Sequence, residues 1–267
     1  MLADTFPVAA AVLRERWRGL VLWVIAVAAV SAMYVAFWPA FGDAEEMLAF
    51  VDNLPEAMVT AMGYDRIGSA AGYLESTVFG LLAPILMLVF AITAGGRLIA
   101  GQEEDGTLEL ELAHPVARRR VVAERLAVLA ASVLAITIAV AAVTTVMVLA
   151  LDMDVAVSAV VATATGLALL TLGFGALALA VGAATGRRAV AIGTAAGLAV
   201  LTYIGDAVAP LVEWGGVLEV VSPFTWYLGA DPLATGWDPT GLAALAAITL
   251  VAAGVALVAF DRRDLGV

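Results

Sequence analysis

The stretch GQEEDGTLELELAHPVARRR, residues 101–120, separates two long apolar runs and carries five acids, the only histidine of the chain and three consecutive arginines. The runs on either side lie at residues 77–99 and 121–151. Each is long enough for a helix across the apolar core of a bilayer, which is about 30 Å thick. The sequence therefore predicts two membrane-spanning helices with this polar stretch as their connection outside the membrane.

The rest of the chain has the same character. Its 267 residues are 63% hydrophobic and only 14% charged, and the mean hydropathy of +1.03 lies outside the range of soluble domains. Four more apolar runs lie at residues 20–38, 155–183, 189–211 and 240–260. We therefore predict an all-α integral membrane protein with six transmembrane helices, all within one transmembrane domain that covers residues 1–267.

The arginines predict the orientation of these helices. Twelve of the thirteen arginines fall before the first predicted span, around residues 101–120, between the fourth and fifth spans, or after the sixth; the thirteenth is Arg66. Basic residues concentrate in the cytoplasmic connections of membrane proteins. Both termini and residues 101–120 are therefore predicted to be cytoplasmic.

Two polar segments outside the spans also carry structural signals. Residues 4–18 combine a capping residue, an early proline and separate apolar and basic faces, which predicts an interfacial helix ahead of the first span. Residues 212–238 are rich in aromatic side chains and prolines, and this composition favours a segment at the outer membrane interface.

Composition excludes several kinds of site. The chain has no cysteine, so thiolate metal sites and cysteine nucleophiles are excluded, and its single histidine, His114, is too few for a histidine metal site. All thirteen basic residues are arginines, and a chain without lysine cannot form a P-loop for ATP. We therefore expect no catalytic residue, no bound cofactor and no metal site in this chain.

A few polar and small residues near the spans remain candidates for function. Glu75 and Asp206 lie near the outer ends of spans, where an acid either reaches the interface or lines a substrate pathway. The patterns GAATG at residues 182–186 and GTAAG at residues 193–197 favour close helix packing, either within the chain or against a second copy.

Residues 101–120 themselves predict a short helix of about ten residues. Glu103, Glu104 and Asp105 suit its first turn, where the helix dipole favours negative charge, and Pro115 disfavours helix at the preceding residue. The alternation of leucine and glutamate at residues 108–112 resembles a strand, but a lone strand beside a membrane has no sheet to join.

The same stretch resembles the permease subunits of ABC-2 type exporters. Between their second and third transmembrane helices these carry two acids, a variable position, Gly-Thr-Leu-Glu, several leucines, and then Pro-Val with a basic cluster. This chain has EEDGTLE at residues 103–109, followed by LELAHPVARRR. The resemblance extends to LPEAMVTAMGYD at 54–65, SPFTWYLGADPL at 222–233 and FDRRDLGV at 260–267, and so covers nearly the whole chain.

The resemblance implies a permease that pairs with a separate ABC ATP-binding subunit, which would bind the ATP and Mg²⁺. Closure of two such subunits would switch a dimer of permeases, identical or different, between inward and outward conformations. Such a complex exports a small or amphipathic compound across the plasma membrane of a prokaryote and has no nucleic-acid partner. The region 101–115 would be the coupling helix that docks on the ATP-binding subunit, through Glu103, Glu104, Asp105, Gly106, Thr107, Leu108, Glu109 and Leu112.

Other interpretations predict different features. A transporter driven by an ion gradient is the alternative function. Such proteins usually carry internal repeats and acids near the centres of their spans, whereas the centres of the predicted spans of this chain contain no acid. An intramembrane enzyme is a second alternative, and the single histidine and the lack of cysteine argue against it. For residues 101–120, the alternative to a coupling helix is a solvated connection whose arginines only set the orientation.

Overall fold

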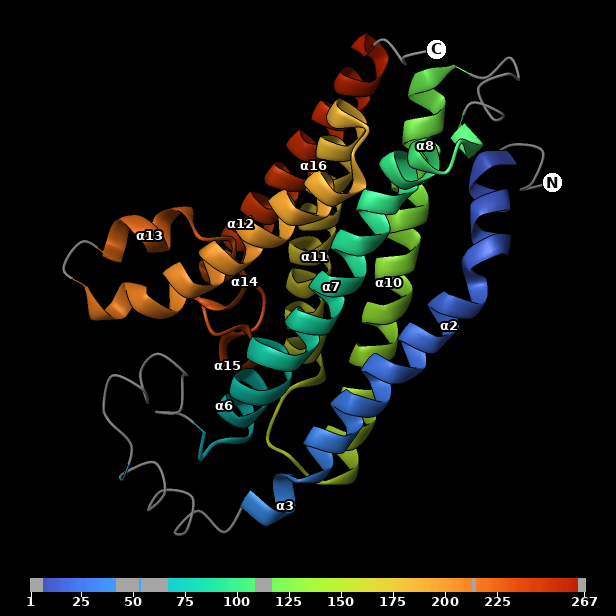
Figure 1. Ribbon diagram of the computed structural model, residues 1–267. Helices are drawn as coiled ribbons and strands as arrows, with labels where there is room; N and C mark the ends of the chain where they lie inside the picture. The colour runs from blue at the N-terminus through green and yellow to red at the C-terminus, as the bar shows by residue number, and fades with distance from the viewer. Residues whose placement is uncertain (1–6, 42–52, 54–66, 109–116, 213–214, 264–267) are drawn as a thin grey trace.

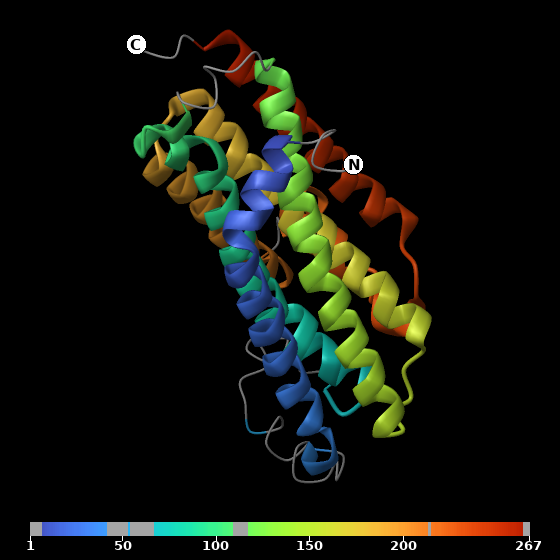
Figure 2. The ribbon, with the colours of Figure 1, turned by 90° about the vertical axis from the view of Figure 1, so that its right-hand side faces the viewer.

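The computed structural model describes residues 7–41, 53, 67–108, 117–212 and 215–263. All regular secondary structure in these ranges is helical, and the long helices lie side by side in one elongated bundle (Figures 1 and 2). The predicted all-α fold is therefore confirmed for the described part of the chain.

Six helical stretches in the described ranges are long and apolar enough to cross a membrane, as the six apolar runs predict. The second stretch consists of consecutive α-helical and π-helical pieces that follow one another without a break. Short helices lie between the fifth and sixth stretches. In chain order the elements are α2 (Pro7–Ala36), α3 (Trp38–Phe41), α6 (Ala70–Leu74), η2 (Glu75–Leu82), α7 (Ala83–Gly96), η3 (Arg97–Gly101), α8 (Gln102–Glu104), α10 (Arg118–Ala150), α11 (Val157–Thr185), α12 (Arg188–Val208), η4 (Ala209–Leu211), α13 (Gly215–Val221), α14 (Pro223–Leu228), α15 (Pro232–Thr235) and α16 (Pro239–Arg262).

The first span and the helix predicted before it form one continuous helix, α2. Pro7 is its first residue, a position that proline favours because no backbone N–H is needed there. Gly19 lies at the expected boundary, but a single glycine costs only about 1 kcal/mol in a helix, so the helix continues. Location of its first turns at the membrane interface stays a prediction, and residues 4–6 lie outside the described residues.

Helix α11 lies at the centre of the bundle and packs against α7, α10, α12 and α16. Small residues make this packing close: a Cβ atom added to Gly95 of α7 would collide with the backbone carbonyl of Gly175 in α11, and one on Gly182 would lie 3.3 Å from the Cβ of Ala100. The glycines of α11 therefore serve packing within the chain. The glycines of α12, which are Gly193, Gly197 and Gly205, have open space beside them.

Twelve of the thirteen arginines gather at one end of the bundle. The beginnings of α2, α10 and α12 lie at this end with α8 and the last turns of α11 and α16 (Figure 1). The twelve arginines lie in these parts of the chain, directly beside them, or in η3, which precedes α8, whereas Arg66 lies outside the described residues. We call this end the arginine end. The clustering of the arginines here agrees with the prediction that twelve of them lie on one side of the membrane.

The segment between α12 and α16 packs in part against the bundle, and its location at the outer membrane interface stays a prediction. Its helix α14 packs against α11, α12 and α16, and Phe224 and Tyr227 are buried, whereas Trp237 is 53% exposed. Ser222 caps the helix by accepting hydrogen bonds from the backbone N–H groups of Phe224 and Thr225, and Pro223 occupies its first position. Gly166 of α11 leaves room for the ring of Tyr227, because an added Cβ would lie 2.9 Å from that ring.

Candidate functional site

The second span ends at the arginine end in the acidic stretch that the sequence singles out. Its helix continues through α8 to Glu104 and ends there because Gly106 adopts a left-handed conformation, with φ of +70°. The backbone N–H of Gly106 donates to the carbonyl of Glu103 at 3.1 Å, and Thr107 Oγ1 donates to the carbonyl of Gln102 at 3.1 Å. Glu103 and Glu104 therefore occupy the last turn of a long helix.

This position differs from the predicted one. We expected Glu103, Glu104 and Asp105 in the first turn of a separate helix, but Gly101 before α8 is itself helical and belongs to η3, so no helix begins there. The glutamates instead lie at the C-terminal end of the helix, where the dipole disfavours negative charge. The remainder of the predicted coupling helix, with Glu109 and Leu112, lies outside the described residues.

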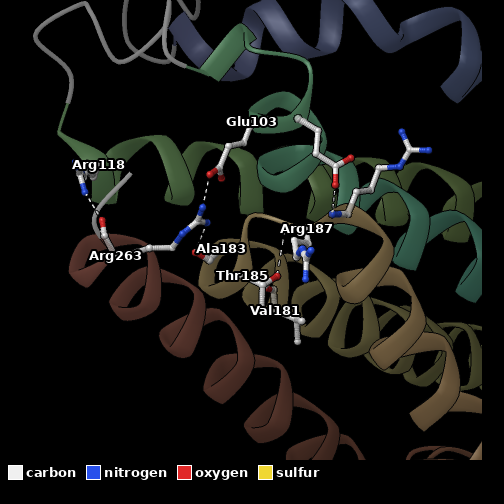
Figure 3. Close-up of polar contacts among 9 residues, drawn as sticks. Glu103, Arg118, Val181, Ala183, Thr185, Arg187 and Arg263 are labelled. Carbon is white, nitrogen blue, oxygen red and sulfur yellow. Dashed lines mark hydrogen bonds and ion pairs between the residues drawn. The ribbon is translucent and has the colours of Figure 1, made fainter. Parts of the chain in front are cut away.

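Glu103 is paired with an arginine from the far end of the chain. Its carboxylate forms an ion pair with Arg263, which directly follows α16, and both side chains are mostly buried. Arg263 also donates to the carbonyl of Ala183 in α11 at 3.2 Å, and its own carbonyl accepts from Arg118 of α10 at 2.7 Å (Figure 3). One ion pair therefore joins the end of the second span to the ends of α11 and α16.

Glu104 is engaged with a different helix. Its Oε1 atom accepts a hydrogen bond from the backbone N–H of Arg188, the first residue of α12, at 2.8 Å. The residue before it, Arg187, supplies no side-chain cap to that helix. Glu104 therefore caps α12 from outside, and its charge interacts favourably with the positive end of the α12 dipole. We call the Glu103–Arg263 ion pair and the Glu104–Arg188 hydrogen bond together the glutamate brace.

Comparison with known protein families agrees with the resemblance of the acidic stretch. A family model described as ABC-2 family transporter protein matches residues 7–265. The chain belongs to this family. A search of curated proteins gave no match. The protein is therefore a multi-pass membrane permease of the ABC-2 type, and membership of this family generally implies an ABC ATP-binding partner.

The permease exposes only part of the predicted coupling residues. Glu104, Asp105, Gly106 and Thr107 are exposed, whereas Leu108 is 1% exposed and packs within the chain. In this structure Leu108 is therefore an internal contact and does not present its side chain to a partner. In the described part of the segment, Asp105, Gly106 and Thr107 are the exposed predicted residues outside the brace, and Glu104 is exposed but bonded to α12.

The three consecutive arginines of the permease make contacts within the chain. Arg118 donates to the carbonyl of Arg263, Arg119 forms an exposed ion pair with Asp261 at 2.8 Å, and Arg120 pairs with Glu124, one turn further along α10, at 2.9 Å. Arg118 and Arg119 thus secure the beginning of α10 to the end of α16, whereas the contact of Arg120 lies within α10.

Sequence reasoning missed Glu124. This glutamate is 3% exposed, and its Oε2 atom accepts from the backbone N–H of Ala9, in the first turn of α2, at 2.9 Å. It therefore caps α2 from α10, as Glu104 caps α12. The sequence does contain a signal for it, because Glu124 is an acid inside an apolar run, four residues after Arg120. A charged side chain in a span usually has a partner, so a bond from Glu124 could have been predicted.

The two acids predicted near the outer ends of spans both lie beside α14. Asp206 accepts a hydrogen bond from Thr225 Oγ1. Tyr227 donates to the carbonyl of Phe79 in η2 at 3.0 Å. Burial raises the pKa of Tyr227, which lies outside the six candidate spans, well above its ordinary value, and the carboxylate of Glu75 raises it further. A role of Glu75 and Asp206 in a substrate pathway stays a prediction.

Proposed function

We propose that this ABC-2 permease exports a small or amphipathic compound, driven by ATP that a separate ABC subunit hydrolyses. The arginine end faces the cytoplasm, because basic residues concentrate on that side of a membrane. Both termini then lie inside a prokaryotic cell, and the acidic stretch faces the ABC subunit. ATP and Mg²⁺ bind to that subunit, and two permease copies form the translocation unit.

The glutamate brace is the observation that supports coupling. An ABC subunit that docks on residues 105–107 touches the chain directly beyond Glu103 and Glu104. Because these glutamates bond to Arg263 and to the first residue of α12, displacement of the docking segment is transmitted to the ends of α12 and α16. Rigid-body movement of packed helices of this kind is a recognised way to switch between conformations.

The second span also contains two π-helical stretches, η2 and η3, which flank α7. A π-helix departs from regular α-helical hydrogen bonding and often occurs at functional sites. Because η3 lies between α7 and the brace, we propose that it adjusts when the docking segment moves. The regular α7 would then turn as a unit between η2 and η3.

The experiment separates docking from transmission. The permease is co-expressed with its ABC subunit, and assembly, ATP hydrolysis and transport are measured in liposomes. Asp105→Arg changes an exposed docking residue, so we expect weaker assembly and less ATP hydrolysis. Glu103→Gln keeps the docking surface but breaks the ion pair, so we expect normal assembly with less transport per ATP hydrolysed.

The control is Asp154→Arg, which makes the same charge change at an exposed position between α10 and α11, at the opposite end of the bundle. It should leave assembly with the ABC subunit unchanged. Normal assembly and hydrolysis in Asp105→Arg would contradict docking at this segment. Transport that needs no ABC subunit but stops when an ionophore removes the ion gradient would identify the alternative, a secondary transporter.

A further inference from the structure

A cavity of about 420 Å³ lies between α2, α7 and α10 near the arginine end. Its size is within the range of about 300–1,000 Å³ that is typical of small-molecule sites. None of the residues of the glutamate brace lines it, and neither does any of the exposed docking residues 105–107. Its lining is cationic on one side and apolar on the other.

The cationic side consists of Arg16 on α2 and Arg97 at the end of α7. The two guanidinium groups interact electrostatically, and like charges repel. Among the described residues, neither forms a hydrogen bond or an ion pair. The acids Glu15 and Asp105 act on Arg16 beyond the distance of an ion pair, and only Glu15 lines the cavity, where its side chain is exposed. An anion between the two arginines would relieve their repulsion.

The apolar side is built from aromatic and aliphatic side chains. The rings of Trp23 and Phe90 meet edge to face, with centroids 5.6 Å apart, and Leu20 and Leu129 extend this wall. Gly19 leaves the space open, because a Cβ atom at this position would have no neighbour within 4 Å. A free inorganic anion would leave this apolar surface without a partner, whereas an amphiphile would cover it.

We propose that this cavity holds one anionic phospholipid of the inner leaflet, with its phosphate between Arg16 and Arg97 and an acyl chain against Trp23 and Phe90. Basic pockets between transmembrane helices on the cytoplasmic side bind anionic lipid head groups for the same electrostatic reason. The lipid is a resident component that fills the space between three helices. The proposal requires that the arginine end be cytoplasmic and that the exported compound be a different molecule.

The test is lipid titration of the complete complex, followed by native mass spectrometry. Phosphatidylglycerol is compared with phosphatidylcholine of the same acyl chains. We expect one retained phosphatidylglycerol per permease and little phosphatidylcholine. Each of Arg16→Gln and Arg97→Gln should weaken phosphatidylglycerol binding about fivefold, the contribution of one basic residue near a membrane. Arg14→Gln, an exposed position on the same helix that does not line the cavity, should not.

A second variant tests the cavity without changing charge. Gly19→Phe fills it and should abolish retention, whereas Gly254→Phe on α16, which also has open space beside it, should retain the lipid. Equal retention of both lipids, or full retention by the double arginine variant, would overturn the proposal. ATP-dependent outward movement of labelled phosphatidylglycerol through this site would also overturn it, because the lipid would then be a transported substrate.

Discussion

Breaking the ion pair between Glu103 and Arg263 should destabilise the permease by about 2 kcal/mol. The two side chains are only 24% and 20% exposed. A fully buried charge that loses its partner costs about 3–5 kcal/mol, whereas exposed pairs contribute about 0–1 kcal/mol. Glu103→Gln keeps the shape of the side chain and removes its charge, so the effect should lie between these limits.

The measurement is a double-mutant cycle with Glu103→Gln, Arg263→Gln and the combination. Arg263→Gln also loses the hydrogen bond to the carbonyl of Ala183, so it should cost about 1 kcal/mol more than Glu103→Gln. We expect a coupling energy of about 1–2 kcal/mol between Glu103 and Arg263, since residues in direct contact are not additive. Thermal unfolding in detergent, followed by tryptophan fluorescence, should show Glu103→Gln melting about 4–8 °C lower.

The control is a second ion pair at the same end of the bundle. Arg119 and Asp261 pair at 2.8 Å, but their side chains are 72% and 35% exposed. Arg119→Gln should therefore change the stability by no more than about 0.5 kcal/mol. If Glu103→Gln and Arg263→Gln were additive within about 0.3 kcal/mol, the two residues would not interact in the folded protein, and the brace could not transmit movement.

Three further substitutions test helix packing and helix ends in the bundle. Gly95→Ala would push a Cβ atom into the backbone carbonyl of Gly175, and we expect a loss of about 2–3 kcal/mol in thermal unfolding. Gly186→Ala places alanine at a φ of +65° and its Cβ against the side chain of Arg263. The backbone conformation alone should cost about 1–2 kcal/mol. Because the new Cβ also displaces Arg263 from Glu103, ATP-driven transport should fall. Ser222→Ala removes the cap of α14 and should cost about 1 kcal/mol, seen as faster hydrogen exchange in that helix.

The six spans could be predicted from the sequence because the bilayer imposes one simple requirement. A helix that crosses it needs about 20 apolar residues, and the six predicted apolar runs correspond to the six candidate spans. The helix ends were less predictable. The run at 155–183 becomes α11, Val157–Thr185, because Gly186 adopts the left-handed conformation that terminates it. Likewise, α2 begins before its apolar run because nothing interrupts the helix.

The brace could not be predicted, because its partners are far apart in the sequence. Glu103 and Arg263 are separated by 160 positions, and Glu104 and Arg188 by 84. Periodicity and capping patterns describe neighbours along one helix, and by that reasoning an acid at Glu103 belongs to the beginning of its own helix. The structure instead uses both acids for other helices. Burial of Tyr227 escaped prediction for the same reason, since it depends on the space beside Gly166 in α11.

The polar contacts at the arginine end also predict which helices move together. The brace ties the second span directly to α12 and α16. Glu124 ties α2 to α10, and Arg118 and Arg119 tie α10 to the end of α16. At this end α2 is therefore joined to the braced helices only through α10, and a force on residues 105–107 should move α12 and α16 with the second span more than it moves α2. The proposed lipid cavity lies between α2 and α7, where such a shift would change its volume.

Spin labels can measure this movement, because the chain has no cysteine of its own. Leu22 of α2, Leu201 of α12 and Leu250 of α16 are 68%, 69% and 72% exposed, so each accepts a label without disturbing the packing. With labels in one permease copy of the complex, the distance between positions 22 and 201 should change on ATP binding, and that between 201 and 250 should not. Glu103→Gln should uncouple α16, so that the second distance also varies. A constant distance between positions 22 and 201 in the wild type would show that the brace holds the helices together without transmitting motion.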